Sequence, residues 1–277
     1  MQRRKHKKIN HTTGRKGSNF AGVNERGLLA TVGYFGEELA TAILKGERVS
    51  DDTDYGFADV VNHGHAIAAE VKMANGRHAH RPMPEQIERL HKGVARPSFL
   101  YSHGVYFLIC YCGVVETIEN KGKSMLWSRR NSCRKRKLLI AQELQYIYVV
   151  DVEFLHYLAE NEPTFLRNGA IVSSEGRSNR ETVLYLNRTT LGGFLKRTEE
   201  SRLLLERALG RHKWCVATRQ VNLCFTGEAE KQEESQGQLS LPLRRTIPVY
   251  FIGKKSTGKA ITSLLDGRNV EVPIVGN

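Results

Sequence analysis

The feature that most constrains this chain is a series of three apolar runs in its N-terminal half. They are FADVV (57–61), AIAAEVK (66–72) and GVYFLICYCGVV (104–115). Runs that are apolar at almost every position are typical of strands buried on both faces of a sheet. The polar turn between the first two runs is short enough to join neighbouring strands. The runs therefore predict at least three central strands.

Two segments around these strands have helical spacing instead. Phe35, Leu39 and Ile43 recur every four residues in 33–47, and a second apolar stripe follows a proline in 85–94. The resulting order is helix, strand, strand, helix, strand. We expect an α/β fold, in which helices flank a mixed central sheet.

The rest of the chain is divided by changes in composition. A strand and a helix are expected at 144–152 and 153–162, and residues 228–238 are polar without an apolar anchor, as in linkers. We expect five segments: a basic flexible arm (1–32), a core (33–162), a C-terminal α+β elaboration or small second domain (163–227), a polar linker (228–247) and a C-terminal segment (248–277).

Charge indicates the kind of partner. The chain has 42 Lys and Arg against 29 Asp and Glu, a formal net charge of +13, which favours a polyanion such as DNA. The longest apolar run is too short to span a bilayer, so we expect no membrane partner. The five cysteines are scattered and odd in number, so we expect free thiols and a cytoplasmic protein.

Two acids and a lysine interrupt the apolar strands. Glu70 and Lys72 are two residues apart, so in a strand both project from one face while Val71 projects from the other. Asp59 lies in the preceding strand, so the two acids can converge. A charge in a buried strand is costly unless it has a partner or a function. The pattern favours a functional site, and the alternative is an ordinary hairpin with a solvated Glu–Lys pair.

These groups are the ones that hydrolysis of a phosphodiester requires. Carboxylates hold Mg²⁺, which prefers oxygen ligands and keeps part of its water shell. The ion neutralises the charge that develops on the phosphate and stabilises the leaving oxygen, and a lysine orients the attacking water. A second Glu-x-Lys at 119–121 lies in a polar basic segment outside any strand, so we expect only the first to be functional.

The arrangement of Asp59 and Glu70-Val71-Lys72, after a helix and before a helix and a strand, resembles the PD-(D/E)xK, or restriction-endonuclease-like, nuclease superfamily. The layout of GEELA (36–40) before DVV and EVK is similar to that of Holliday-junction resolvases. The resemblance covers about 33–115 and implies a restriction-endonuclease-like core. Ala58 stands where the superfamily has its name-giving proline.

The resemblance also implies roles for individual residues. Asp59 and Glu70 would be metal ligands and Lys72 the catalytic lysine, with Mg²⁺ as the cofactor and Mn²⁺ as a substitute. Glu37 would be the acid on the first helix that holds a metal or its water, with Glu38 as the fallback. Gln86 would be the optional glutamine on the following helix.

Two further segments indicate contacts with partners. The run RRNSCRKRK (129–137) favours a loop that grips the DNA backbone through six basic residues, although a solvated basic loop is the alternative: Arg129, Arg130, Arg134, Lys135, Arg136 and Lys137. The peptide QLSLPL (238–243) resembles the motif with which bacterial repair proteins bind the sliding clamp, through Gln238, Leu239, Leu241 and Leu243. The alternative is that these leucines pack into the protein's own core.

Together these observations predict a Mg²⁺-dependent DNA endonuclease that acts in restriction or in DNA repair and recombination. A clamp-binding peptide would favour repair, and cutting of both strands would favour a homodimer. The competing hypothesis is a non-catalytic DNA-binding protein with an inactive nuclease fold, because the basic segments alone would supply affinity for DNA.

Overall fold

The structure is a computed structural model that describes residues 25–49, 58–76, 79–96, 100–112, 132–172, 178–227, 241–265 and 268–275. Its helices are α1 (Glu25–Leu44), α2 (Pro84–Val94), α3 (Cys133–Gln142), α4 (Val152–Asn161), α5 (Arg188–Leu195), α6 (Glu199–Leu209) and α7 (Lys255–Leu265). Its strands are β1 (Glu47–Arg48), β2 (Val60–Asn62), β3 (Ile67–Asn75), β4 (His103–Tyr111), β5 (Leu144–Asp151), β6 (Leu166–Val172), β7 (Ser178–Leu184), β8 (Trp214–Thr226), β9 (Leu243–Lys254) and β10 (Asn269–Pro273).

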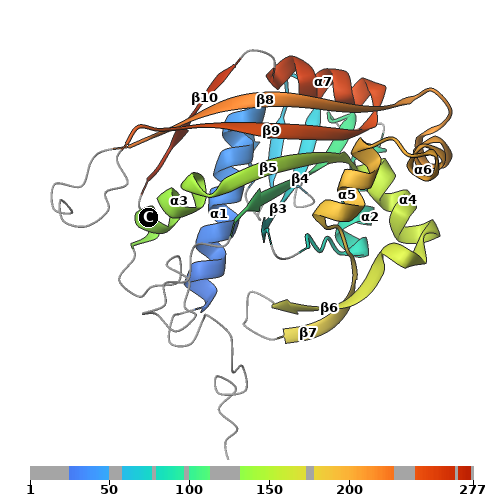
Figure 1. Cartoon of the computed structure of the whole chain (residues 1–277), viewed down its shortest axis with the longest axis horizontal. Helices are drawn as coiled ribbons and strands as arrows, with labels where there is room; N and C mark the ends of the chain where they lie inside the picture. Colours follow the sequence, from blue (N-terminus) through green and yellow to red (C-terminus); the bar gives the residue numbers. More distant parts are fainter. Residues whose placement is uncertain are drawn as a thin grey trace, which may run out of the picture.

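One large sheet organises the molecule (Figure 1). Its eight strands lie in the order β1-β2-β3-β4-β5-β9-β8-β10. The pairs β3–β4, β5–β9 and β8–β10 are parallel, and the other neighbouring pairs are antiparallel. The expectation of an α/β fold with a mixed central sheet flanked by helices is confirmed.

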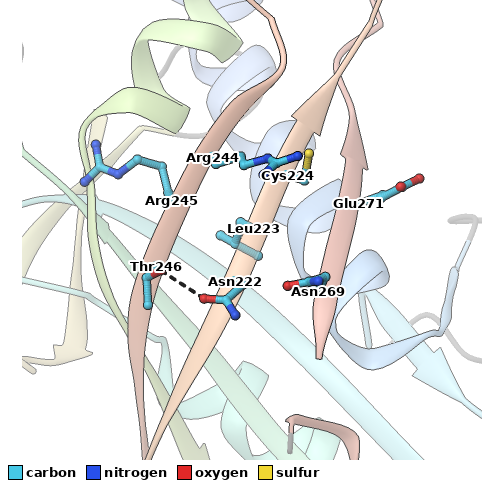
Figure 2. Close-up of a pocket in the computed structure, with 8 residues that line it drawn as sticks. All are labelled: Asn222, Leu223, Cys224, Arg244, Arg245, Thr246, Asn269 and Glu271. Atoms are coloured by element: carbon cyan, nitrogen blue, oxygen red, sulfur yellow. Dashed lines mark hydrogen bonds between the residues drawn. The ribbon is translucent and has the colours of Figure 1, made fainter. Parts of the chain in front are cut away.

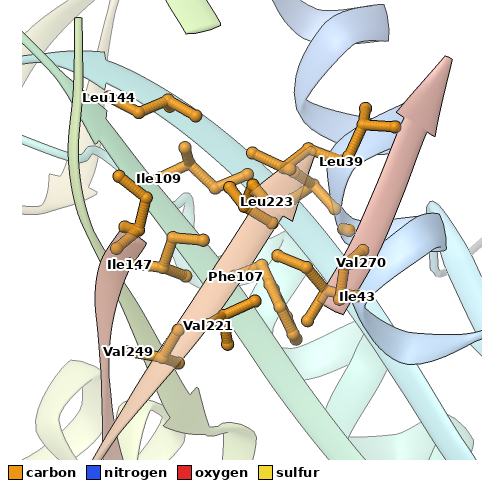
Figure 3. Close-up of a cluster of buried hydrophobic side chains, with 14 of the residues drawn as sticks. Leu39, Ile43, Phe107, Ile109, Leu144, Ile147, Val221, Leu223, Val249 and Val270 are labelled. Carbon is orange, nitrogen blue, oxygen red and sulfur yellow. The ribbon is translucent and has the colours of Figure 1, made fainter. Parts of the chain in front are cut away.

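Helix α1 packs on one face of this sheet, which curls around it: the helix contacts β1, β2 and β3 towards one end of the sheet and β10 at the other. Leu39 and Ile43 of α1 meet Phe107 of β4 and Val270 of β10 in the larger hydrophobic cluster (Figure 3). All four side chains are buried. The predicted apolar stripe of this helix is therefore its core face.

Helices α2, α4, α5 and α6 belong to a second cluster on the opposite face. Side chains of β3 and β4 alternate between the two clusters, as the period of a strand requires. Ala69 and Phe107 point to the α1 side, whereas Ala68 and Leu108 point to the α2 side. The near-continuous apolar runs thus reflect burial on both faces.

Several boundaries differ from those expected. Helix α1 begins at Glu25, eight residues before the start expected at 33, and Thr31 and Val32 ahead of the expected start are also buried. Strand β2 is only Val60–Asn62, so Asp59 immediately precedes it instead of lying inside it.

The segment expected as a basic loop ends differently as well. Its residues from Cys133 onward belong to α3. The first turn of α3 is capped by Ser132, whose hydroxyl accepts a hydrogen bond of 3.2 Å from the amide of Lys135. Arg134, Lys135, Arg136 and Lys137 are therefore helical residues and not loop residues.

Strands from the C-terminal half join the large sheet and also form a small second one. Strand β8 pairs with β9 and β10 inside the eight-stranded sheet, whereas β6 and β7 form a separate two-stranded sheet. The segment 248–277 contributes to the centre of the large sheet, because β9 lies between β5 and β8. Among the described residues, every helix is too short or too polar to cross a membrane.

Candidate functional site

Asp59 and Glu70 lie opposite each other where β2 begins beside β3. Val60 pairs with Ala69, so Asp59 is the next residue along and faces Glu70 across the hairpin. The side chain of Asp59 is fixed to the neighbouring strand, because its Oδ2 accepts a hydrogen bond of 2.7 Å from the amide of Val71. The main-chain amide of Asp59 donates to the carbonyl of Ala69 at 2.9 Å. The two acids thus come together as the sequence predicts.

Lys72 joins them from the same strand face. Its Nζ donates a hydrogen bond of 2.6 Å to Oε1 of Glu70. The Glu70 side chain is 10% exposed and that of Lys72 is 28% exposed, so the ammonium group lies at the border between the protein interior and solvent. The predicted triad of Asp59, Glu70 and Lys72 is therefore a single cluster.

Glu37 approaches this cluster from α1. The preceding residue is Gly36, where a Cβ atom would lie 2.6 Å from Cγ of Met73, so glycine lets the helix lie directly against β3. The charges of Asp59 and Glu70 both act on Glu37. In this structure its carboxylate is paired with Arg48 of β1 at 2.6 Å. The guanidinium of Arg48 also stacks over the ring of Tyr34, 4.9 Å from its centroid.

Glu38, the fallback acid, points elsewhere. Its Oε1 is 2.7 Å from Nζ of Lys137, which also donates to the carbonyl of Val275 at 3.1 Å. Lys137 is only 1% exposed. The geometry distinguishes the two neighbouring acids, because Glu37 faces the cluster and Glu38 forms a buried ion pair with α3. The assignment of Lys137 to DNA contacts is corrected, since a buried, paired ammonium group is out of reach of a phosphate.

Burial and mutual repulsion make both inner carboxylates harder to ionise. The pKa of Glu70 is raised by burial first and by the charge of Asp59, against the lowering effect of Lys72. The pKa of Glu37 is raised by burial and by Asp59, and Arg48 acts against both. Desolvated acids that repel each other gain from a cation placed between them.

Within the described part of the chain, no three His, Cys, Asp or Glu side chains are arranged to enclose a metal ion as they stand. Arg48 and Lys72 hold two of the carboxylates through their own positive charges. Mg²⁺ does not need three protein ligands, because it commonly takes one or two carboxylates and completes its shell with waters and phosphate oxygens. Asp59 and Glu70 are a donor set of this kind.

Three residues near the cluster are absent from the sequence-based prediction. Arg48 pairs with Glu37, and the charge of Arg89 on α2 acts on Glu70. Tyr106 is the residue of β4 that pairs with Glu70 in the parallel register, and its side chain is fully buried. Gln86, the predicted helix residue, lies one turn before Arg89 on α2, and that spacing is the only sequence signal for Arg89.

His80 contacts the strand that carries Glu70 and Lys72. It is buried, its ring hydrogen-bonds to the backbone of Lys72, and its main chain pairs with Leu186. Burial lowers the pKa of His80 to about 3. His78, two residues earlier in the chain, lies outside the described residues.

We expect His80 to make folding pH-dependent. Between about pH 6.5 and pH 3 the unfolded chain binds a proton at this position and the folded chain does not, so stability is complete above the unfolded pKa and falls as pH drops. The slope is up to about 1.4 kcal/mol per pH unit. Urea unfolding of His80→Gln at pH 7, 6 and 5 should give a flatter pH dependence than wild type, whereas the partly exposed His65→Gln should follow wild type. Equal slopes in all three proteins would contradict this role.

The remaining predicted contacts are only partly within the described residues. Arg134, Lys135 and Arg136 are half-buried on α3, and Arg129 and Arg130 lie outside. For the clamp-like peptide, Gln238 and Leu239 lie outside, whereas Leu241 and Leu243 pack against the larger hydrophobic cluster. This packing agrees with the alternative that these two leucines serve the protein's own core.

A hollow of about 410 Å³ lies apart from the acidic cluster, over β8, β9 and β10 (Figure 2). It shares no residue with the cluster on β2 and β3. Thr246 and Asn222 hydrogen-bond across it at 2.9 Å. Its lining consists of Asn222, Leu223, Cys224, Arg244, Arg245, Thr246, Asn269 and Glu271.

We compared the chain with models of protein families, with curated proteins and with solved structures, and found no match in any of the three.

Proposed function

We propose that this chain is a Mg²⁺-dependent DNA endonuclease of the PD-(D/E)xK type. The observation that carries the proposal is the convergence of Asp59, Glu70 and Lys72 on one hairpin, with Glu37 brought beside them by α1. This is the residue set that the sequence resemblance implies, and it comes from α1 and from the hairpin β2–β3 that follows it in the chain.

The donor set fits a divalent cation. Asp59 and Glu70 would hold it, and Glu37 would join them after leaving Arg48. A bound Mg²⁺ would supply Lewis-acid activation of water and neutralise charge on the phosphate. A cation also relieves the repulsion that raises the pKa values of Glu37 and Glu70.

The protein's own groups have defined tasks in this proposal. The amide of Val71 fixes Asp59, so one ligand is oriented before any metal arrives. Lys72 holds Glu70 in the free protein, and its ammonium group would orient the attacking water once that contact is released. Arg89, which is exposed and close enough to act on Glu70, is positioned to contact a phosphate.

The order of elements supports a restriction-endonuclease-like core. Helix α1, the hairpin β2–β3, helix α2 and strand β4 follow one another as the resemblance implies, and β3 and β4 are parallel neighbours. Strands β8, β9 and β10 would then be an elaboration that extends the sheet and closes it against α1.

DNA is the proposed substrate because of the net charge of +13. A role in restriction and a role in repair or recombination are both consistent with this site. The sliding clamp stays a proposed partner, although Leu241 and Leu243 would have to leave the core surface to reach it. A homodimer would be required for coordinated cutting of both strands.

The test is cleavage by the purified protein. Wild type should nick plasmid or branched junction DNA in Mg²⁺ or Mn²⁺ but not in EDTA, and Asp59→Ala should bind the same DNA without cutting it. Binding without cleavage by wild type in either metal would favour a non-catalytic DNA-binding protein over the enzyme.

A further inference from the structure

Tyr106 places a buried polar group beside the acidic cluster. The hydroxyl of Tyr106 is buried, and among the described residues it has no hydrogen-bond partner. A buried hydroxyl without a partner weakens the fold, so such a group calls for an explanation, and one explanation is an acceptor that becomes available only in another state of the site.

The position of Tyr106 identifies that acceptor. Tyr106 on β4 pairs with Glu70 on β3, and in a parallel pair the side chains of register partners lie on the same face. Of the charged groups that act on Tyr106, Glu70 has the largest effect, followed by Asp59 and Arg89. Burial and these two acids raise the pKa of Tyr106, so the phenol keeps a proton that it can donate to a carboxylate, and an ionised carboxylate can only accept.

In the free protein Glu70 already has a donor, because Lys72 holds its Oε1 at 2.6 Å. A divalent cation at Asp59 and Glu70 would compete with that ammonium group through like charge and release it. Glu70 would then lose the contact that orients it. Carboxylates that bind metals are usually held by a further hydrogen bond from the protein.

We propose that Tyr106 is a positioning residue that donates a hydrogen bond to the carboxylate of Glu70 once a divalent cation has displaced Lys72. The hydroxyl thus replaces the lysine and keeps Glu70 oriented as a ligand, which leaves Lys72 available for the substrate. This inference rests on the proposed function, because it requires that Glu70 binds a cation.

The experiment compares Tyr106→Phe with Tyr101→Phe by two readouts. Tyr101 is a matched control, since it is equally buried but its hydroxyl lies 2.9 Å from Nδ1 of His63. The first readout is the melting temperature of the metal-free protein. The second is Mn²⁺ affinity, titrated by electron paramagnetic resonance without DNA.

Tyr106→Phe should melt at or above the wild-type temperature, because the change removes an unsatisfied hydroxyl, and should bind Mn²⁺ about 10- to 100-fold more weakly. Tyr101→Phe should melt lower and bind Mn²⁺ as wild type does. Wild-type Mn²⁺ affinity in Tyr106→Phe would overturn the role of Tyr106 and leave the proposed nuclease intact. Failure of wild type itself to bind Mn²⁺ would overturn both.

Discussion

Glu70→Gln should abolish cleavage and stabilise the protein at the same time. In the proposed function Glu70 is a metal ligand, and loss of its carboxylate would remove several kcal/mol of transition-state stabilisation, which corresponds to a fall of about 10³-fold or more in the cleavage rate. The amide keeps an oxygen that can accept from Lys72, but it carries no buried charge. Because burial is the main cause of the raised pKa of Glu70, we expect the metal-free variant to melt a few degrees higher at pH 7.

The sign of the pH dependence makes this prediction specific. A carboxyl whose pKa is raised by folding binds its proton more tightly in the folded state, so its cost to stability is absent below the unfolded pKa and complete above the folded one. The stability gained by Glu70→Gln should therefore be seen at pH 7 and vanish below about pH 4.5.

Glu47→Gln is the matched control, because Glu47 lies on β1 with a side chain that is 76% exposed. It should change neither cleavage nor melting. Cleavage by Glu70→Gln at the wild-type rate would show that Glu70 is not part of the site. A lower melting temperature of Glu70→Gln would show that the Glu70–Lys72 ion pair outweighs the cost of burial.

Lys137→Met should strongly destabilise the protein. It would leave Glu38 as an unpaired charge in a largely buried position, and breaking a buried ion pair in this way costs about 3–5 kcal/mol. Lys135→Met on the same helix, where the side chain is partly exposed, should change the free energy of unfolding by less than about 1 kcal/mol. Urea unfolding measures both.

A double variant separates the ion pair from other effects. Adding Glu38→Gln to Lys137→Met removes the orphaned charge, so part of the lost stability should return. The opposite result, a Lys137→Met protein as stable as wild type but weakened in DNA binding, would restore the sequence-based view of Lys137 as a phosphate contact.

The centre of the site could be predicted from sequence because its residues are neighbours in one hairpin. A short turn makes Asp59 and Glu70 neighbours, and the period of a strand places Glu70 and Lys72 on one face. The helix register likewise predicts the buried stripe of α1. These relations involve residues close together in the chain, so pattern and chemistry are enough.

The parts that could not be predicted depend on distant partners. Glu37 and Glu38 are adjacent, and only the packing of α3, about a hundred residues away, decides which one faces the cluster. Tyr106 is opposite Glu70 because of the register between β3 and β4, which no turn fixes. Similarly, β9 enters the middle of the sheet from the C-terminal segment through a pairing that sequence periodicity does not encode.

The central claim is that Asp59 and Glu70 hold a divalent cation, and crystals grown with Mn²⁺ test it most directly. The anomalous signal of manganese locates the ion without assumptions about the protein. We expect a peak about 2 Å from carboxylate oxygens of both Asp59 and Glu70, with Lys72 moved away from Glu70. A map with manganese elsewhere, or with Lys72 still bound to Glu70 and no ion between the two acids, would contradict it.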